Sequence, residues 1–342
     1  MMQSKLAVVI LNYNGKRHLE TFLPSVIQFS KPHQIVVADN CSTDNSIKFI
    51  EDNFHEIQIL KNDENGGFAK GYNDALKKLE GSFDYYLLLN SDVQVTPNWI
   101  EPLLNELKNQ NLAACQPKIL SYADKTKFEH AGAAGGFIDE DYFPFCRGRI
   151  FEETEKDNGQ YDYPTEITWT SGAAMLIRSD LFHSVNGFDE HFFAHMEEID
   201  LCLRLGKKGY KFSCNSASTV FHLGGGTLPY KSANKVYLNF RNNLFMLVKN
   251  HPGWLFPKLF KRMTLDGIAA FKFLSEGKFS FFWKVFLSHM QLYLNLPRLL
   301  KQRAELKIDS HSFKKYHGSI LWAYFIQKNN HFSKLNSRKF EL

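Results

Sequence analysis

The 342-residue sequence predicts an α/β fold in which helices flank a mostly parallel, doubly wound sheet. Three observations lead to this prediction. Short apolar runs alternate four times with segments of helical periodicity near the N-terminus. Each run ends in polar or glycine residues, and right-handed crossovers would place all four ends on one edge of the sheet. The last quarter of the chain is basic, aromatic and amphipathic, which indicates a C-terminal helical extension.

The apolar runs and the helical periodicity define the expected elements. We expect strands at 6–11, 35–38, 57–60 and 85–89, and helices at 17–29, 44–53 and from the turn at 65–67 to about 79. Pro97 favours the start of a fourth helix. Further along, the patterns predict a flap or short hairpin at 131–166, an interrupted strand at 166–177, and helices at 196–208, 233–249 and between 254 and 300.

The charge distribution divides the chain into two parts. Residues 251–342 contain 16 Lys and Arg against 5 Asp and Glu, whereas residues 1–250 contain 25 against 31. We expect one domain over 1–250 and a basic, aromatic-rich helical extension over 251–342. The extension suits an in-plane contact with an anionic membrane surface. The alternative is a helical appendage packed on the first domain or in a homodimer, and no nucleic-acid-binding motif is recognisable.

Cysteine use and hydropathy indicate the compartment. The five cysteines are odd in number and form no CxxC pair, which favours reduced, buried thiols of a cytosolic protein over a disulfide framework or a zinc site. No apolar run of 18 residues occurs, and the N-terminus does not read as a signal peptide. We therefore expect a cytoplasmic protein that binds the inner face of the membrane peripherally.

Polar residues at the predicted strand ends indicate a ligand crevice. Tyr13, Asp39, Gly66-Gly67 and Asp92 each follow a predicted strand, and ligands of open α/β sheets bind beyond the carboxyl ends of the strands. Asp92 closes the run Asn90-Ser91-Asp92, where a carboxylate could hold a hard divalent cation that substrate phosphates complete. The simpler interpretation of the tripeptide is a helix N-cap.

Eight motifs occur in order, at residues 8–15, 37–46, 65–73, 87–92, 171–178, 187–190, 197–204 and 222–227. Together they resemble the inverting family-2 glycosyltransferases with the GT-A fold, and most closely the rhamnosyltransferase-like branch. The resemblance covers about residues 5–250. It implies transfer of a sugar from a nucleotide-diphosphate donor with inversion at the anomeric carbon.

The resemblance assigns donor-binding roles to the first four strand ends. Asp39 would bind the base or ribose of the nucleotide; the alternative is a cap for the following helix. Tyr13, next to Asn12, would flank the base; the alternative is an aromatic side chain of the core. Gly66-Gly67 would let backbone N–H groups approach the diphosphate. Lys70 would add charge there, unless it is an ordinary solvated helix lysine.

The resemblance also implies a divalent cation, Mg²⁺ or Mn²⁺. Asp92 matches the metal-binding acid of the family's Asp-x-Asp element, in which Asn90 here replaces the first acid. Because the site then has one strong anionic ligand, we expect it to bind the metal only weakly when the nucleotide-sugar donor is absent. His222 matches a histidine that completes the metal or phosphate site in relatives, and a satisfied core histidine is the alternative.

The acids at 197–200 carry the expected chemistry. Inverting transfer needs one carboxylate to take the proton from the attacking hydroxyl, and Glu198 lies at the base position of the family pattern. Glu197 and Asp200 stay open for this role, and Asp200 could instead pair with Arg204 four residues away. A cluster of acids that complements the helix dipole is the structural alternative.

We expect Trp169, Gly172 and Asp189 to shape the acceptor side of the site. The alternative for Trp169 is a side chain that packs in the core. The acceptor is expected to be a glycan, plausibly lipid-linked, in bacterial surface polysaccharide synthesis. A dehydrogenase is disfavoured because no GxGxxG follows the first strand, and a nucleotidyltransferase lacks its basic glycine signature. A non-catalytic sugar-nucleotide-binding module stays open.

Overall fold

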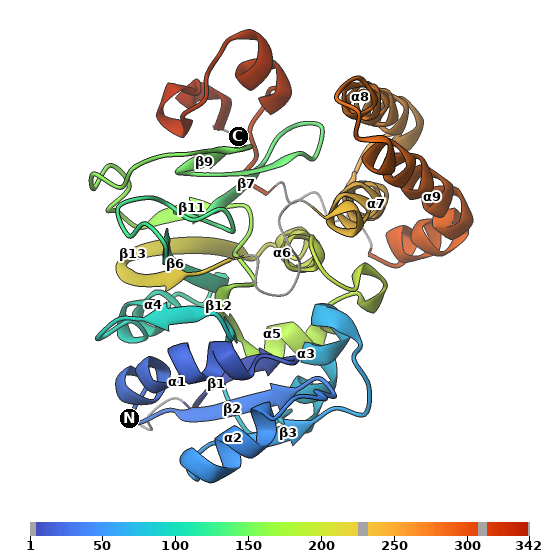
Figure 1. Cartoon of the computed structure of the whole chain (residues 1–342). Coiled ribbons are helices and arrows are strands. Elements are labelled where there is room, and N and C mark those ends of the chain that lie inside the picture. The colour runs from blue at the N-terminus through green and yellow to red at the C-terminus, as the bar shows by residue number, and fades with distance from the viewer. Residues whose placement is uncertain (1–4, 225–231, 307–312, 341–342) are drawn as a thin grey trace.

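The computed structural model describes residues 5–224, 232–306 and 313–340 (Figure 1). A large sheet with helices on both faces lies at the centre of the structure. Its strand order is β11-β13-β6-β12-β4-β1-β2-β3, with β5 paired to β13. Two clusters of buried apolar side chains fill the two faces of this sheet. The expected α/β architecture with a C-terminal helical extension is confirmed.

One half of the large sheet is parallel. It contains β1 (Leu6–Asn12), β2 (Gln34–Asp39), β3 (Gln58–Lys61) and β4 (Tyr85–Asn90). The connecting helices are α1 (Lys16–Phe29), α2 (Ser46–Asn53) and α3 (Gly67–Lys78). Because all four strands run in one direction, their carboxyl ends share one edge, as the alternating pattern predicted.

The other half of the sheet is mixed. It contains β5 (Val93–Val95), β6 (Leu112–Ser121), β11 (Thr165–Ile167), β12 (Ala174–Arg178) and β13 (Lys211–His222). Strand β12 runs antiparallel to both β4 and β6, whereas β13 is parallel to β6. The single interrupted strand expected at 166–177 was wrong in one respect, because β11 and β12 pair with different neighbours.

Two further expectations differ from the structure. The helix expected from Pro97 is α4 (Glu101–Glu106), which begins four residues later with Pro102 in its first turn. The flap expected at 131–166 is a second, antiparallel sheet of β7 (Gly136–Ile138), β8 (Pro144–Cys146), β9 (Arg149–Ile150) and β10 (Glu153–Thr154). Residues 313–340 lie beside this sheet, and the Tyr316 N–H donates to the Ile138 carbonyl at 2.9 Å (Figure 1).

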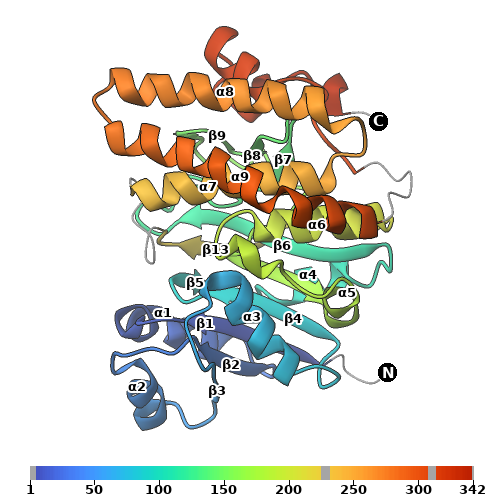
Figure 2. The ribbon, with the colours of Figure 1, turned by 90° about the vertical axis from the view of Figure 1, so that its right-hand side faces the viewer.

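The helices between β12 and residue 306 lie on one side of the molecule (Figure 1). They are α5 (Ser179–Ser184), the 3₁₀ turn η1 (Glu190–Phe192), α6 (Glu197–Lys207), α7 (Ala233–Asn250), α8 (Leu255–Ser275) and α9 (Phe279–Glu305). Helices α7, α8 and α9 lie side by side next to α6 (Figure 2). The expected boundary at residue 250 falls between α7 and α8, and α9 packs along α7. The division into two domains stays a prediction.

No helix within the described ranges is long and apolar enough to cross a bilayer. All five cysteines are free thiols, but the expectation that all are buried was wrong for Cys41, which is exposed in the loop after β2.

Candidate active site

Asn12 and Asp39 meet at the carboxyl ends of β1 and β2. The Asn12 amide donates to Asp39 Oδ1 at 2.9 Å and to the Ser46 hydroxyl at 2.9 Å. The Ser42 N–H donates to Asp39 Oδ2 at 3.0 Å. Asp39 is buried, while neighbouring Tyr13 is 41% exposed at the same edge. Both predicted nucleotide-side residues therefore lie at one rim, and Asp39 also caps the turn that follows its strand.

The start of α3 contacts the loop that precedes α6. Gly67 has φ +74°, and the Phe68 and Ala69 N–H groups donate to the Phe193 carbonyl at 2.7 and 3.2 Å. A Cβ on Gly67 would lie 2.5 Å from that carbonyl oxygen, so the contact requires glycine. The N–H groups expected to face a diphosphate thus have a protein partner in this structure. Lys70 Nζ bonds Asp74 Oδ2 at 2.6 Å, on the same helix.

His222 lies between two carboxylates. Its Nε2 lies 3.2 Å from Asp92 Oδ1, its Nδ1 lies 3.1 Å from Glu129 Oε2, and Asn90 Nδ2 lies 3.4 Å from Nε2. Burial alone would lower the pKa of His222, but Asp92 and Glu129 raise it to about 10. Burial opposes the ionisation of Asp92, and His222 nevertheless holds the pKa of that carboxyl below its ordinary value.

The donor set of this cluster fits a divalent cation. A carboxylate oxygen and an imidazole nitrogen lie 3.2 Å apart, and both are ligand types that Mn²⁺ accepts once the cation displaces the proton from the ring nitrogen. In the described part of the chain, no group of three or more His, Cys, Asp and Glu side chains converges as a metal cluster. The expected motif 222–227 continues beyond the described residues after Gly224.

The acid pair starts α6 after a left-handed backbone segment. Phe193, His195 and Met196 have φ between +63° and +73°, a conformation that costs non-glycine residues energy. Burial raises the pKa of Glu197 well above its ordinary value, and the neighbouring Glu198 raises it further. Burial raises the pKa of Glu198 to about 7. A carboxyl of this pKa suits a general base near neutral pH.

The buried Cys146 thiol is influenced by two acids of the site, Glu129 beside His222 and Glu198 of α6. Burial is the main cause that raises the pKa of this thiol to about 11, and the charges of Glu129 and Glu198 both add to the increase. Both carboxylates therefore lie within electrostatic reach of one sulfur atom.

Asp200 is fully buried in an ion network. Its Oδ2 accepts from Arg204 Nε at 2.8 Å and from Lys249 Nζ at 2.9 Å, and its Oδ1 accepts from the Asn250 amide at 2.8 Å. The pairing with Arg204 considered from the sequence is confirmed. Because its oxygens face cations and an amide inside the protein, Asp200 is placed to hold α6 rather than to meet a substrate.

The three acceptor-side residues lie in different surroundings. Trp169 is buried, donates its ring N–H to the Phe137 carbonyl at 2.9 Å and packs on Gly136, so its location favours the core alternative. Gly172 lies next to the Phe68 ring. The side chain of Asp189 is 6% exposed and accepts from Lys249 Nζ at 2.7 Å.

A family model described as Glycosyl transferase family 2 matches residues 7–183, just over half of the chain. The chain belongs to glycosyltransferase family 2. This glycosyltransferase is 25% identical over 285 residues to the N-acetylglucosaminyl-diphospho-decaprenol L-rhamnosyltransferase of two Mycobacterium tuberculosis strains, and the match covers 79% of this chain and 92% of theirs. It is 23% identical to rhamnosyltransferase WbbL of Escherichia coli K12, over 63% of this chain and 82% of the relative.

Solved structures confirm the GT-A fold of the glycosyltransferase. GalNAc-T7, solved with UDP, GalNAc and Mn²⁺, superposes with a TM-score of 0.62 at 15% identity, over 96% of this chain and 57% of that one. The mannosyltransferase PcManGT from Pyrobaculum calidifontis, solved with GDP-Man and Mn²⁺, gives 0.52 at 12% identity, over 90% and 86%.

Two groups of site residues were missed from the sequence. Glu129, the second carboxylate on His222, follows β6 without any motif of its own. Lys249, Arg298 and Gln302 meet Asp189 from α7 and α9, up to 113 positions away in the chain. For Arg298 the basic charge of the extension was the only signal in the sequence, and that charge does not indicate which residue it pairs with.

Proposed function

We propose that this glycosyltransferase moves a sugar, with inversion, from dTDP-rhamnose or a UDP-sugar to a lipid-linked glycan acceptor in bacterial surface polysaccharide synthesis. The observation that carries the proposal is the buried pairing of Asp92 with His222 at the strand ends, together with Glu198 at the start of α6, whose pKa burial raises to about 7. Inverting transfer needs a base on one side of the anomeric carbon and charge stabilisation for the leaving group on the other.

Glu198 is the proposed base. At neutral pH about half of a carboxyl group with this pKa is ionised, and the ionised form can take the proton of the attacking hydroxyl. Burial, and then the charge of Glu198, raise the pKa of the neighbouring Glu197 well above its ordinary value, so the two acids oppose each other's ionisation. We assign Asp200 to the support of α6 because of its buried ion pairs.

Asp92 and His222 would hold the divalent cation, Mg²⁺ or Mn²⁺. When bound, the cation neutralises the negative charge that develops on the leaving diphosphate. The protein's own part is to present a carboxylate oxygen and a ring nitrogen 3.2 Å apart, with Glu129 fixing the ring through its other nitrogen. Asp39, Asn12 and Tyr13 would bind the nucleoside at the neighbouring strand ends.

The acceptor proposal rests on an exposed surface of the extension, which we call the α8–α9 face. It comprises Trp254, Phe256, Phe260, Phe271, Phe279 and Trp283, of which Trp254 is 78% exposed. Large exposed apolar patches mark contact sites, and the surrounding lysines favour an anionic bilayer at the inner face of the membrane. The relatives named for a lipid-diphosphate substrate support this location. A homodimer through the same face is the competing interpretation.

A donor panel tests the proposed function. We would measure the UDP or dTDP released from dTDP-rhamnose and common UDP-sugars in the presence of Mn²⁺, Mg²⁺ or EDTA. The proteins compared are wild type, Asp92→Ala, Glu198→Gln and the exposed control Glu56→Gln. The proposal expects metal-dependent release from one donor that both site variants lose and the control retains. Metal-dependent donor binding without release, even with lipid-linked acceptors, would favour the non-catalytic binding module, and no binding at all would overturn both.

A further inference from the structure

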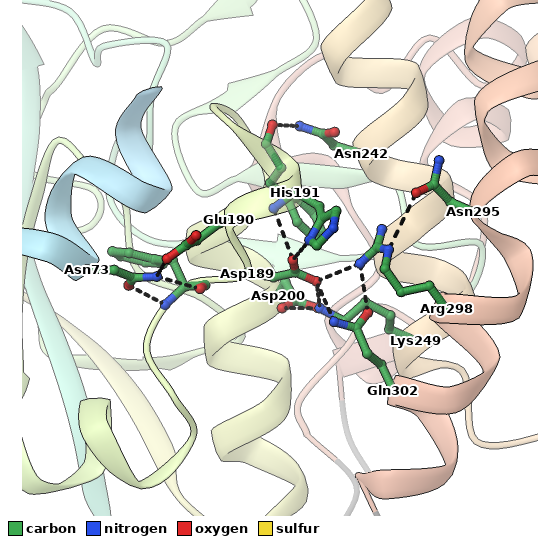
Figure 3. Close-up of polar contacts among 12 residues, drawn as sticks. Asn73, Asp189, Glu190, His191, Asp200, Asn242, Lys249, Asn295, Arg298 and Gln302 are labelled. Carbon is green, nitrogen blue, oxygen red and sulfur yellow. Dashed lines mark hydrogen bonds and ion pairs between the residues drawn. The ribbon is translucent and has the colours of Figure 1, made fainter. Parts of the chain in front are cut away.

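Asp189 connects the loop before α6 to the C-terminal helices. Its Oδ2 accepts from Lys249 Nζ of α7 at 2.7 Å and from Gln302 Nε2 of α9 at 3.1 Å, and Arg298 Nη1 of α9 lies 3.5 Å away (Figure 3). Its Oδ1 accepts from the His191 N–H at 3.1 Å. One buried carboxylate thus joins η1, α7 and α9.

The same cluster extends into the helix that begins with the acid pair. Lys249 Nζ also donates to Asp200 Oδ2 at 2.9 Å, so one buried ammonium bridges Asp189 and Asp200. Arg204, paired with Asp200, donates to the carbonyls of Val185 and Gly187 at 2.7 Å each. The network therefore holds both the loop before η1 and the first turns of α6.

Helix α7 also holds the left-handed segment. The Asn242 amide donates to the carbonyls of Phe192, Ala194 and His195 at 2.9, 2.9 and 2.7 Å. Strained backbone of this kind persists only where its surroundings determine it. The hydrogen bonds from Asn242 of α7 stabilise this strained backbone directly before Glu197 and Glu198.

The other side of this segment contacts the donor-side helix. The Phe193 carbonyl accepts from the N–H groups at the start of α3. Asn73 of α3 lies against the same loop (Figure 3), and its amide donates to the Phe188 carbonyl at 2.9 Å. The Phe188 N–H donates back to Asn73 Oδ1 at 2.9 Å. Residues 188–196 are thus fixed between α3 on one side and the C-terminal helices on the other.

We infer that Arg298 and Gln302 of α9 are positioning residues for the acid pair: through Asp189 they fix residues 189–196 and so the placement of Glu197 and Glu198. This inference rests on the proposed function for its effect on rate. It makes the extension a working part of the catalytic centre rather than only an anchor. A carboxylate that is displaced by about 1 Å can lose about 100-fold in rate, which is why a distant contact matters.

Three variants of α9 test the inference in the full-length protein. Arg298→Ala and Gln302→Ala each remove one contact to Asp189. Lys301→Ala is the matched control, because Lys301 is exposed on the same turn and its one ion pair among the described residues is with Glu305, at 4.0 Å. With saturating substrates, kcat should fall about 10- to 100-fold in Arg298→Ala and Gln302→Ala but not in Lys301→Ala. The donor KM should stay within about twofold, because the donor-side strand ends are untouched. Arg298→Lys, which retains the charge, should recover most of the lost kcat.

Hydrogen–deuterium exchange provides a readout that needs no activity. Amides of residues 190–200 should exchange faster in Arg298→Ala and Gln302→Ala than in wild type, with exchange in β1–β4 unchanged. If wild type transfers no sugar, the proposed function fails, while the exchange result still tests the positioning role. Unchanged exchange at 190–200, unchanged kcat per folded enzyme, or a loss confined to donor KM would each overturn the inference.

Discussion

His222 Nε2 lies 3.2 Å from Asp92 Oδ1 in the buried centre of the site, although the two residues are 130 positions apart in the sequence. The pair forms because β5 and β13 run antiparallel, which places Val93 opposite His222. The second ring nitrogen of His222 contacts Glu129, so the ring orientation is fixed before any ligand binds.

We predict that Asp92→Asn abolishes the effect of metal on donor binding. The amide keeps the shape of the side chain but removes the anionic ligand, and metal and diphosphate then lack a common anchor. Calorimetric titration of UDP or dTDP with and without Mn²⁺ measures the effect, and the exposed Asp63→Asn is the control. Equal metal enhancement in Asp92→Asn and wild type would show that the cation is held elsewhere.

The rate of transfer should rise with pH through about 7. The base must be ionised, and burial raises the pKa of Glu198 to about 7, so kcat/KM should increase up to that value and level off above it. In Glu198→Gln, kcat should be about 10²- to 10⁴-fold lower, and kcat/KM should no longer rise with pH through about 7. If kcat/KM of the variant still rises with pH through about 7, the base is another residue.

The same pKa predicts an effect on stability. The folded-state pKa of Glu198 is raised above its ordinary value of 4.5 to about 7, so its contribution to stability is present below pH 4.5 and is lost as pH rises through 7. Glu198→Gln, which cannot ionise, should match wild type in Tm near pH 4.5 and exceed it at pH 8. Thermal unfolding across this range measures the difference, and a constant difference would contradict the raised pKa.

Gly67→Ala should destabilise the protein more than Gly81→Ala. Both glycines have φ near +75°, so the backbone cost of about 1–2 kcal/mol is common to both. A Cβ at Gly67 meets the Phe193 carbonyl at 2.5 Å, whereas a Cβ at Gly81 meets nothing within 4 Å. Overpacking should therefore add about 1–3 kcal/mol at Gly67 alone, measurable by urea unfolding. Equal losses would show that the contact between α3 and the loop yields easily.

Binding to anionic vesicles should depend on the α8–α9 face. The triple variant Trp254→Ser, Phe256→Ser and Phe260→Ser removes exposed rings of 78%, 67% and 66% accessibility without touching the buried core. It should lose flotation with anionic vesicles, while Tyr163→Ser, exposed elsewhere, should retain it. Flotation of the triple variant equal to wild type would remove the membrane assignment, and a change of mass in solution instead would favour the homodimer.

The sequence by itself determined the parallel half of the fold and the rim of the site. Alternation of apolar strands with amphipathic helices is a local property, and right-handed crossovers convert it into a common edge for Asp39, Gly67 and Asp92. The acids at 197–200 were recognisable because their order along one helix is also local.

Only the tertiary structure decided which of these polar residues meet a ligand site and which hold the protein together. Asp189 and Asp200 both look like site acids in the sequence, yet Lys249 bridges them inside the protein. Trp169 is buried against Gly136, and β12 runs antiparallel between β4 and β6. These outcomes depend on contacts between segments far apart in the chain, and the periodicity of one segment contains no information about the partner that will neutralise its charge or cover its ring.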